Sequence, residues 1–316
     1  MQMTELCDIV QLRQKGTYKY MEIRVLRYFL MIARTESITK AAEALHITQP
    51  TLSRQIRELE EEIGTDLFLR GSRKIRLTPE GYLLKERAEE ILELTDKTME
   101  DLRASSDKVE GMITIATGLI RSTDLLTRMI TEFRKQYPHV RFTIMTATAD
   151  TIRYQLHRSL IDFGVMLEPV DLTGLSFIRF PEPETWNLLV RTDDPLAEKE
   201  SVCAEDLYDR ELILPFRGPL VSELYRWLKK DPDELNVICY NALGGTAAHV
   251  VNNSHAVSLN VSGSLPFLDA GQIKILPLSP PLTGRSSIAW KRDSVQTEPA
   301  KRFIDFVSCF PGMENV

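Results

Sequence analysis

The sequence predicts a multidomain fold with an α-rich N-terminal part, one long connecting helix and a larger α/β part of two subdomains. Three observations predict it. Residues 22–63 carry apolar side chains at helical spacing, residues 79–105 repeat them in heptads, and strand patterns alternate with helical patterns from residue 112 onward. With 316 residues, of which 43% are hydrophobic, the chain can bury more than one core.

The N-terminal part centres on two helices joined by a tight turn, which follow a first helix over residues 22–35. Ser37 or Thr39 can cap the first of the two, where Ala41, Ala42 and Leu45 recur at helical spacing. Thr48 is placed as the N-cap of the second, and Pro50 falls in its first turn. Its apolar positions, expected to face inward, are Leu52, Ile56, Leu59 and Ile63, and its outward polar set is Gln49, Thr51, Ser53, Arg54 and Arg57.

This pattern is typical of a helix-turn-helix, whose second helix enters the major groove of DNA. Gln49 can pair with adenine, Arg54 with guanine or phosphate, and Ser53 with either. The alternative is an ordinary helical hairpin whose polar face only meets water.

A basic hairpin follows the two helices. Residues 67–77 read LFLRGSRKIRL, which is an apolar strand, a Gly-Ser turn and a returning strand without a single acid. Its cations are Arg70, Arg73, Lys74 and Arg76. The pattern predicts a wing whose cationic tip suits the sugar-phosphate backbone.

The stretch LRYFLMIARTESITKAAEALHITQPTLSRQIRELEEEIGTDLFLR, with LTPEG at 77–81, resembles the winged helix-turn-helix of LysR-type transcriptional regulators. The resemblance implies sequence-specific binding to a double-stranded DNA operator, modulated by a small-molecule effector. It places base and phosphate contacts on Thr48, Gln49, Pro50, Ser53 and Arg54, and wing contacts on Arg70, Arg73 and Lys74. His46, in the turn, is given no ligand role.

Composition restricts the function classes. A net charge of -6 and a pI near 5.6 argue against a basic protein that coats nucleic acid, and residues 21–78 hold 10 Lys+Arg against 8 Asp+Glu, so positive charge is local. The four cysteines lie far apart without zinc-site spacing, so we expect reduced thiols, no metal and no cofactor. No apolar run could span a bilayer and residues 1–20 lack a signal-peptide core, which predicts a cytoplasmic protein without membrane contact.

The expected domains follow the chain in order. Residues 1–20 form an N-terminal extension, expected to be disordered, 21–78 the winged helix-turn-helix, 79–106 a linker helix, 107–111 a hinge and 112–316 the effector-binding domain. Subdomain I is expected at about 112–183 and 283–316, and subdomain II at about 184–282. The two subdomains together resemble periplasmic solute-binding proteins, with crossovers near 181–185 and 279–284, and the alternation of strands and helices predicts parallel sheets.

The linker helix carries a heptad stripe made of Leu84, Ala88, Ile91, Thr95, Thr98 and Leu102. A single helix cannot bury such a stripe by itself, so we expect pairing with a second copy, and the resemblance implies that this helix is a dimer interface. The chain is therefore expected to form a homodimer or homotetramer. The alternative is that the stripe packs on the chain's own body.

An effector is expected beyond the carboxyl ends of the strands. The candidate contacts are Thr117, Gly118, Ser122, Thr148, Phe216 and Arg217, of which the resemblance points to Thr117 and Thr148. The alternative for each hydroxyl is that it only caps a helix. Arg121, Arg153 and Arg217 could neutralise a small anion, which makes an anionic effector one expectation; the alternative for each is an ordinary surface arginine.

No nucleophile, phosphate-loop, dinucleotide or zinc-protease motif occurs, and the five histidines are dispersed, so we expect no enzyme. The alternative function is a solute-binding or scaffold protein whose helical N-terminus is a protein-interaction module and which does not bind DNA. It predicts no salt-sensitive affinity for DNA, whereas the DNA-binding interpretation predicts affinity that falls as salt rises.

Overall fold

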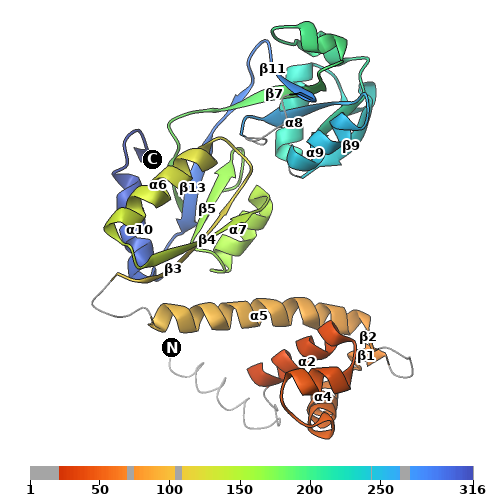
Figure 1. The fold of residues 1–316 in the computed structure, drawn as a ribbon, viewed down its shortest axis with the longest axis vertical. Helices are drawn as coiled ribbons and strands as arrows, with labels where there is room; N and C mark the ends of the chain where they lie inside the picture. Colours follow the sequence, from red (N-terminus) through yellow and green to blue (C-terminus); the bar gives the residue numbers. More distant parts are fainter. Residues whose placement is uncertain (1–20, 70–74, 104–108, 243, 264–270, 316) are drawn as a thin grey trace, which may run out of the picture. The chain divides into compact units, whose positions relative to one another are not determined.

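The computed structural model describes residues 21–69, 75–103, 109–242, 244–263 and 271–315, and the side chains of residues 100–103, 314 and 315 are not part of that description. The chain divides into two compact units, Met1–Met99 and Glu100–Val316 (Figure 1). Three predictions concern residues outside this description. They are those made for residues 1–20, for the wing tip with Arg70, Arg73 and Lys74, and for hinge residues 107 and 108.

Three helices pack around one core in the first unit. They are α2 (Ile23–Thr35), α3 (Ile38–Ala44) and α4 (Gln49–Ile63), as predicted. Phe29 and Ile32 of α2 are fully buried in the same cluster as Leu52 of α4. The Ser37 hydroxyl accepts a hydrogen bond from the Lys40 N–H at 3.4 Å, so the predicted cap of α3 is confirmed.

Helix α4 begins where the sequence predicts and buries most of the expected stripe. Thr48 is its N-cap, although the Thr48 hydroxyl bonds the Thr51 hydroxyl at 2.8 Å instead of a backbone N–H. Leu52, Ile56 and Leu59 are buried. The inward placement of Ile63 is wrong, because the helix ends there, before Gly64 at a left-handed φ of 81°, and Ile63 is 42% exposed.

A buried carboxylate takes the inward position near the end of α4. Glu60 is 7% exposed, and its Oε1 accepts from the N–H groups of Leu67 at 2.9 Å and Phe68 at 3.3 Å. These bonds attach α4 to β1 (Phe68–Leu69), which pairs antiparallel with β2 (Arg76–Leu77), so the predicted hairpin is confirmed.

The LTPEG segment joins this hairpin to α5 (Pro79–Arg103). The Thr78 hydroxyl accepts from the Gly81 N–H at 2.9 Å and donates to the Asp66 carbonyl at 2.8 Å, which fixes the start of the helix. A Cβ at Gly81 would lie 2.2 Å from the Leu67 carbonyl oxygen, so only glycine permits this approach.

The stripe along α5 is divided between two environments. Ala88 is fully buried and Leu84 packs against the core of the first unit, as the alternative interpretation expects. Further along, Thr95 and Thr98 donate to carbonyls of their own helix. The exposed apolar side chains of the described part of α5 are Tyr82, Leu83, Ile91, Leu94 and Met99. At about 100° per residue they point to several sides of the helix, and of the predicted stripe only Ile91 is among them.

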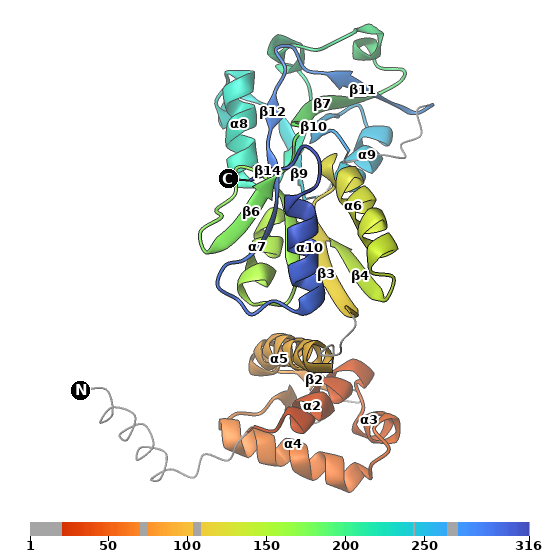
Figure 2. The ribbon, with the colours of Figure 1, turned by 90° about the vertical axis from the view of Figure 1, so that its left-hand side faces the viewer.

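The second unit contains two lobes, each built on a six-stranded sheet (Figures 1 and 2). In lobe I the strand order is β14-β6-β13-β5-β3-β4. The strands are β3 (Gly111–Thr117), β4 (Val140–Thr146), β5 (Phe163–Leu167), β6 (Leu175–Arg179), β13 (Ser286–Lys291) and β14 (Glu314–Asn315). Helices α6 (Ser122–Gln136) and α10 (Glu298–Ser308) bury Phe133 and Phe303 against one face, and α7 (Ala149–His157) covers the other.

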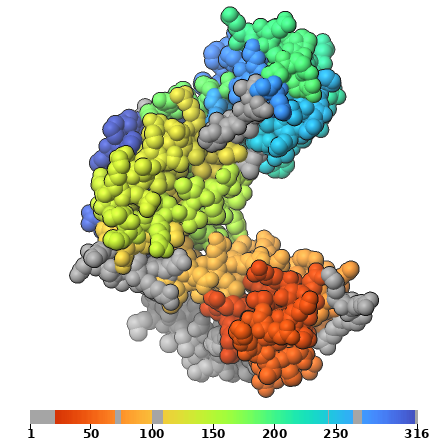
Figure 3. Space-filling view, viewed as in Figure 1, coloured from red at the N-terminus to blue at the C-terminus, as the bar shows by residue number. Residues whose placement is uncertain are grey.

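Lobe II has the strand order β11-β7-β10-β8-β9, with β12 also pairing with β7. The strands are β7 (Glu184–Arg191), β8 (Leu212–Pro215), β9 (Val237–Asn241), β10 (Val257–Val261), β11 (Ile273–Pro277) and β12 (Thr283–Gly284). Helix α8 (Gly218–Leu228) packs on one face and α9 (Gly244–Asn252) on the other, and three short 3-10 helices lie at Pro195–Glu198, Ala204–Leu207 and Pro232–Glu234. Figure 3 shows one face of both lobes in a space-filling view.

The prediction of parallel sheets is only half right, because both sheets are mixed. Strands β4, β3 and β5 are parallel, as are β9, β8 and β10, but β13 and β7 run antiparallel to their neighbours. Both strands enter their sheets from the other lobe, through the crossovers near residues 181–185 and 279–284. The crossovers pair with each other through Thr185 and Thr283.

We expect Glu60→Ala to lower the free energy of unfolding of the first unit by about 1–3 kcal/mol, because it leaves two buried N–H groups without an acceptor. Thermal unfolding of the full chain, followed by circular dichroism, measures this. Glu61→Ala, on the exposed side of the same turn, is the control and should change stability by less than about 0.5 kcal/mol. Equal effects of the two substitutions would contradict the role given to Glu60.

Candidate DNA-reading face and effector cavity

The N-terminal end of α4 presents one polar, exposed face. Thr48, Gln49 and Pro50 are exposed, the Arg54 side chain is 70% exposed and lies 3.9 Å from Glu58, and Ser53 is half-buried. The structure therefore brings together all five of the residues predicted on this helix for DNA contact. The burial of Leu52 on the opposite side of the helix holds this face outward.

The turn before α4 explains why this face begins abruptly. His46 has a left-handed φ of 54°, and the Ile47 N–H bonds the Ala42 carbonyl at 3.0 Å. This closes the chain tightly between α3 and α4. His46 itself is an exposed turn residue.

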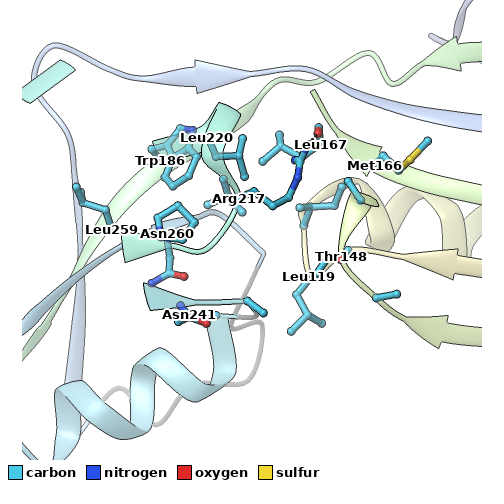
Figure 4. A pocket seen from close by; sticks show the side chains of 18 of the residues that line it. Leu119, Thr148, Met166, Leu167, Trp186, Arg217, Leu220, Asn241, Leu259 and Asn260 are labelled. Carbon is cyan, nitrogen blue, oxygen red and sulfur yellow. Dashed lines mark hydrogen bonds between the residues drawn. The ribbon is translucent and has the colours of Figure 1, made fainter. Parts of the chain in front are cut away.

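A cavity lies in the second unit between the two lobes (Figure 4). Lobe I contributes the ends of β3, β4 and β5, and lobe II contributes β7, β10 and the beginnings of α8 and α9. Its volume is about 90 Å³, which holds roughly six to nine water-sized groups, since each needs about 10–15 Å³. The carboxyl ends of parallel strands thus form one wall, as the sequence predicts.

The structure places three of the six predicted effector contacts in the lining, namely Gly118, Thr148 and Arg217. Thr117 is 2% exposed and donates to the Gly118 carbonyl at 3.0 Å behind the wall. Ser122 is 6% exposed and is bonded elsewhere, and Phe216 is 71% exposed and outside the lining.

Sequence reasoning missed the polar residues Trp186, Asn241 and Asn260, all of which line the cavity. They lie on strands that read as apolar core. The available signal was an asparagine at the end of β9 and another within β10, whose other residues are mostly buried.

Thr148 illustrates the alternative considered for each hydroxyl. It is the N-cap of α7, and its side chain accepts from the Thr151 N–H at 3.4 Å. The N-cap of α8, Arg217, and the first residue of α9, Gly244, line the same cavity. Three helix N-termini therefore favour a ligand oxygen in this space.

Arg217 connects the two lobes. It belongs to lobe II and its side chain is 8% exposed, yet its guanidinium bonds only lobe I atoms in the hydrogen bonds found among the described residues. It donates to Asp150 Oδ2 at 3.3 Å, to the Leu167 carbonyl at 3.3 Å and to the Pro169 carbonyl at 2.8 Å. We call this set of bonds the Arg217 latch.

The other two arginines considered for an anion are paired outside the lining. Arg121 lies 2.6 Å from Glu182, and Arg153 lies 2.9 Å from Asp171. All three guanidiniums are thus paired with carboxylates in the structure, and Arg217 is the one of them that lines the cavity.

The crossover into lobe II begins with a fully buried carboxylate, Glu184. It accepts from the N–H groups of Arg121 at 2.8 Å and Ser122 at 2.9 Å, and from the hydroxyls of Ser122 at 2.7 Å and Ser286 at 3.2 Å. A charge at the N-terminus of α6 is favoured by the helix dipole. Glu184 thus joins both crossovers to lobe I, which explains why Ser122 is not available to the cavity.

The Glu168 carboxylate holds the end of β5, next to the Arg217 latch, in place. Burial opposes ionisation of its carboxyl, but hydrogen bonds from Arg179 and Ser287 outweigh burial and hold the pKa of Glu168 below its usual value. Arg179 donates to it through two nitrogens, at 3.0 and 3.2 Å. The carboxylate fixes the end of β5, from which Leu167 and Pro169 bind Arg217.

Two family models match the chain. Residues 23–82 match the bacterial regulatory helix-turn-helix protein of the lysR family, and residues 106–309 match the LysR substrate binding domain. The regulator BsdA of Bacillus subtilis is 26% identical over 295 residues, covering 90% of this chain and 99% of BsdA. The Hca operon transcriptional activator HcaR of Escherichia coli is 27% identical, covering 91% of this chain and 96% of HcaR.

Solved structures show the same fold. CbnR, a LysR family transcriptional regulator, superposes with a TM-score of 0.72 at 22% identity, covering 91% of this chain and 98% of CbnR. CbnR complexed with its target DNA gives a TM-score of 0.71 at the same identity.

Fold and matches together define a DNA-binding transcriptional regulator with a small-molecule-binding domain. The chain belongs to the LysR family, which confirms the resemblance found in the sequence. Its partners are operator DNA and a small-molecule effector. Within the described residues, no helix is long and apolar enough to cross a membrane, and no group of His, Cys, Asp and Glu could hold a metal.

We expect Glu184→Ala to lower the free energy of unfolding of the second unit by on the order of 3 kcal/mol, because several buried donors lose their acceptor together. Denaturant titration of the full chain measures the change. Glu182→Ala, which removes only the exposed partner of Arg121, serves as the control and should cost no more than about 1 kcal/mol. A loss in Glu184→Ala as small as in the control would rule out a structural role for this carboxylate.

Proposed function

We propose that the exposed face of α4 reads the operator through Thr48, Gln49, Pro50, Ser53 and Arg54, while Arg70, Arg73 and Lys74 of the wing hold the phosphate backbone. The observation that carries this proposal is the division of α4 into a buried apolar stripe and an exposed polar N-terminal face. Gln49 is suited to adenine, and the unburied Arg54 to guanine or phosphate. The positive end of the helix adds attraction for phosphate.

The effector occupies the cavity between the lobes, where Gly118, Thr148 and Arg217 contact it. Thr117 and Ser122 support the wall from behind, through their bonds to Gly118 and Glu184. A ligand that fits one arrangement of the lobes better than another shifts the equilibrium between them. That shift alters the placement of paired DNA-binding domains, and with it operator spacing or bending.

Pairing with a second copy uses α5, along the heptad stripe that continues beyond Leu84 and the buried Ala88 through Ile91, Thr95 and Thr98. In this proposal residues 21–78 are the winged helix-turn-helix, 79–106 the linker helix and 112–316 the effector-binding domain, with the lobes dividing at about 184 and 283. The regulator acts in the cytoplasm and carries out no catalysis.

We expect Arg54→Ala to weaken specific operator binding by about 1–3 kcal/mol, since it removes a side chain that reaches bases or phosphates. Gel-shift titrations at several salt concentrations check this, and wild-type affinity should fall as salt rises. Arg24→Ala, an exposed arginine on α2 paired with Glu22, is the matched control and should leave affinity unchanged. Unchanged affinity in Arg54→Ala would remove this residue from the reading face.

A further inference from the structure

The Asn241 side chain carries a buried hydrogen-bond acceptor that receives no hydrogen. Asn241 ends β9 and is 7% exposed, and its Oδ1 has no hydrogen-bond partner among the described residues. The residue lines the cavity from lobe II (Figure 4). A buried polar atom that stays unpaired is costly, so Oδ1 marks a position where another molecule can complete the bonding.

The lobe II sheet explains why no neighbouring strand supplies this hydrogen. Strand β9 is at the edge of the sheet, and the residue beside Asn241 on β8 is Pro215, whose ring carries no N–H or O–H group. Two residues beyond the pair of Ser258 and Ile213, the β8–β10 register places Asn260 on the other side of Pro215. The Asn260 Nδ2 already donates to the Ser258 hydroxyl at 2.6 Å. A hydrogen for Asn241 therefore has to come from the cavity.

The first turn of α9 lies at the same end of the cavity. Cys239, two residues before Asn241 on β9, packs in the cluster that contains Ala247 of α9, and because side chains alternate along a strand, Asn241 points to the same face. Helix α9 begins at Gly244, which lines the cavity, and a Cβ on Gly245 would meet nothing within 4 Å. The first N–H groups of a helix have no acceptor within that helix, so they favour a ligand oxygen in this open space.

A carboxylate does not suit this position. It has no hydrogen to donate to Asn241 Oδ1, and its charge would lie near another acceptor. The one charged side chain in the described lining is Arg217, and its guanidinium already bonds Asp150 and two carbonyls. Burying a charge without a partner is far more costly than burying a neutral polar group.

From this arrangement we infer that the effector presents a neutral group with both a donor and an acceptor to the start of α9, and that this group is a primary carboxamide. Its N–H donates to Asn241 Oδ1, and its carbonyl oxygen accepts from the first N–H groups of α9. The rest of the molecule is apolar, because Leu119, Leu220 and Leu259 line the same cavity. The inference rests on the proposed use of this cavity for the effector, and it makes Asn241 the residue that selects an amide over an acid.

The test measures the binding of benzamide, acetophenone and benzoate to the full chain by isothermal titration calorimetry. We expect benzamide to bind about ten-fold more tightly than acetophenone, which keeps the carbonyl but leaves Asn241 Oδ1 without a hydrogen. Benzoate should also bind more weakly than benzamide. In a chain containing ¹⁵N-labelled asparagine, benzamide should shift the side-chain signal of Asn241, which is identified by its loss in Asn241→Leu.

Matched variants separate recognition from folding. Asn241→Leu removes the acceptor at similar volume and should weaken benzamide binding about ten-fold while leaving acetophenone binding unchanged. Asn241→Asp adds a negative charge at the same position and should turn the preference from benzamide to benzamidine, a cation with N–H donors. Asn253→Leu is the control and should bind benzamide as the wild type does, because Asn253 is exposed outside the lining and donates to the His249 carbonyl at 2.8 Å. Thermal melting checks that each variant is folded.

The opposite outcomes overturn the inference in distinguishable ways. Equal binding of benzamide and acetophenone, or of benzamide by the wild type and Asn241→Leu, would show that Asn241 Oδ1 accepts no ligand hydrogen. Tighter binding of benzoate would make the ligand an anion in a cavity that is still an effector site. If no probe binds, the carboxamide assignment fails, while the Arg54 gel shift still decides DNA reading independently.

Discussion

The packing of α4 against α2 is the interaction on which the rest of the first unit depends. Leu52, Ile56 and Leu59 recur at four- and three-residue steps and are buried with Phe29, which fixes the rotation of the helix about its axis. That rotation alone decides which side chains face outward. Glu60 then fixes the far end of the helix to β1, so the polar N-terminal face and the wing hairpin are held by one small core.

The second unit depends on two buried charged side chains that are held by hydrogen bonds, Glu184 and Arg217. Glu184 binds both crossovers to lobe I, and the Arg217 latch crosses from lobe II to lobe I beside the cavity. A buried charge is tolerated only while it is paired, so any rearrangement of the lobes has to keep or replace these bonds. This requirement favours two distinct arrangements of the lobes over a continuous range of lobe positions. A small ligand that binds one arrangement more tightly then shifts the equilibrium toward it.

Much of this organisation follows from the sequence. Helical spacing and caps located α2, α3 and α4, the Gly-Ser turn located the hairpin, and strand-helix alternation located the elements around the cavity. Spacing could not predict that Glu60 would be buried, because the N–H groups it binds come from a segment placed by the fold. Three other features depend in the same way on contacts between residues far apart in the chain. They are the antiparallel entry of β7 and β13, the bonding of Ser122 to Glu184, and the placement of Trp186 and Asn241 in the cavity lining.

The central claim is that the N-terminal face of α4 reads bases. Selection of bound sequences from a random DNA pool, carried out with the wild type and with Gln49→Ala, tests it most directly. The account predicts that the wild type selects a defined site and that Gln49→Ala loses the preference for adenine at one position of each half-site while the other positions are kept. Identical selected sequences from both proteins, or no selected sequence from the wild type, would contradict it.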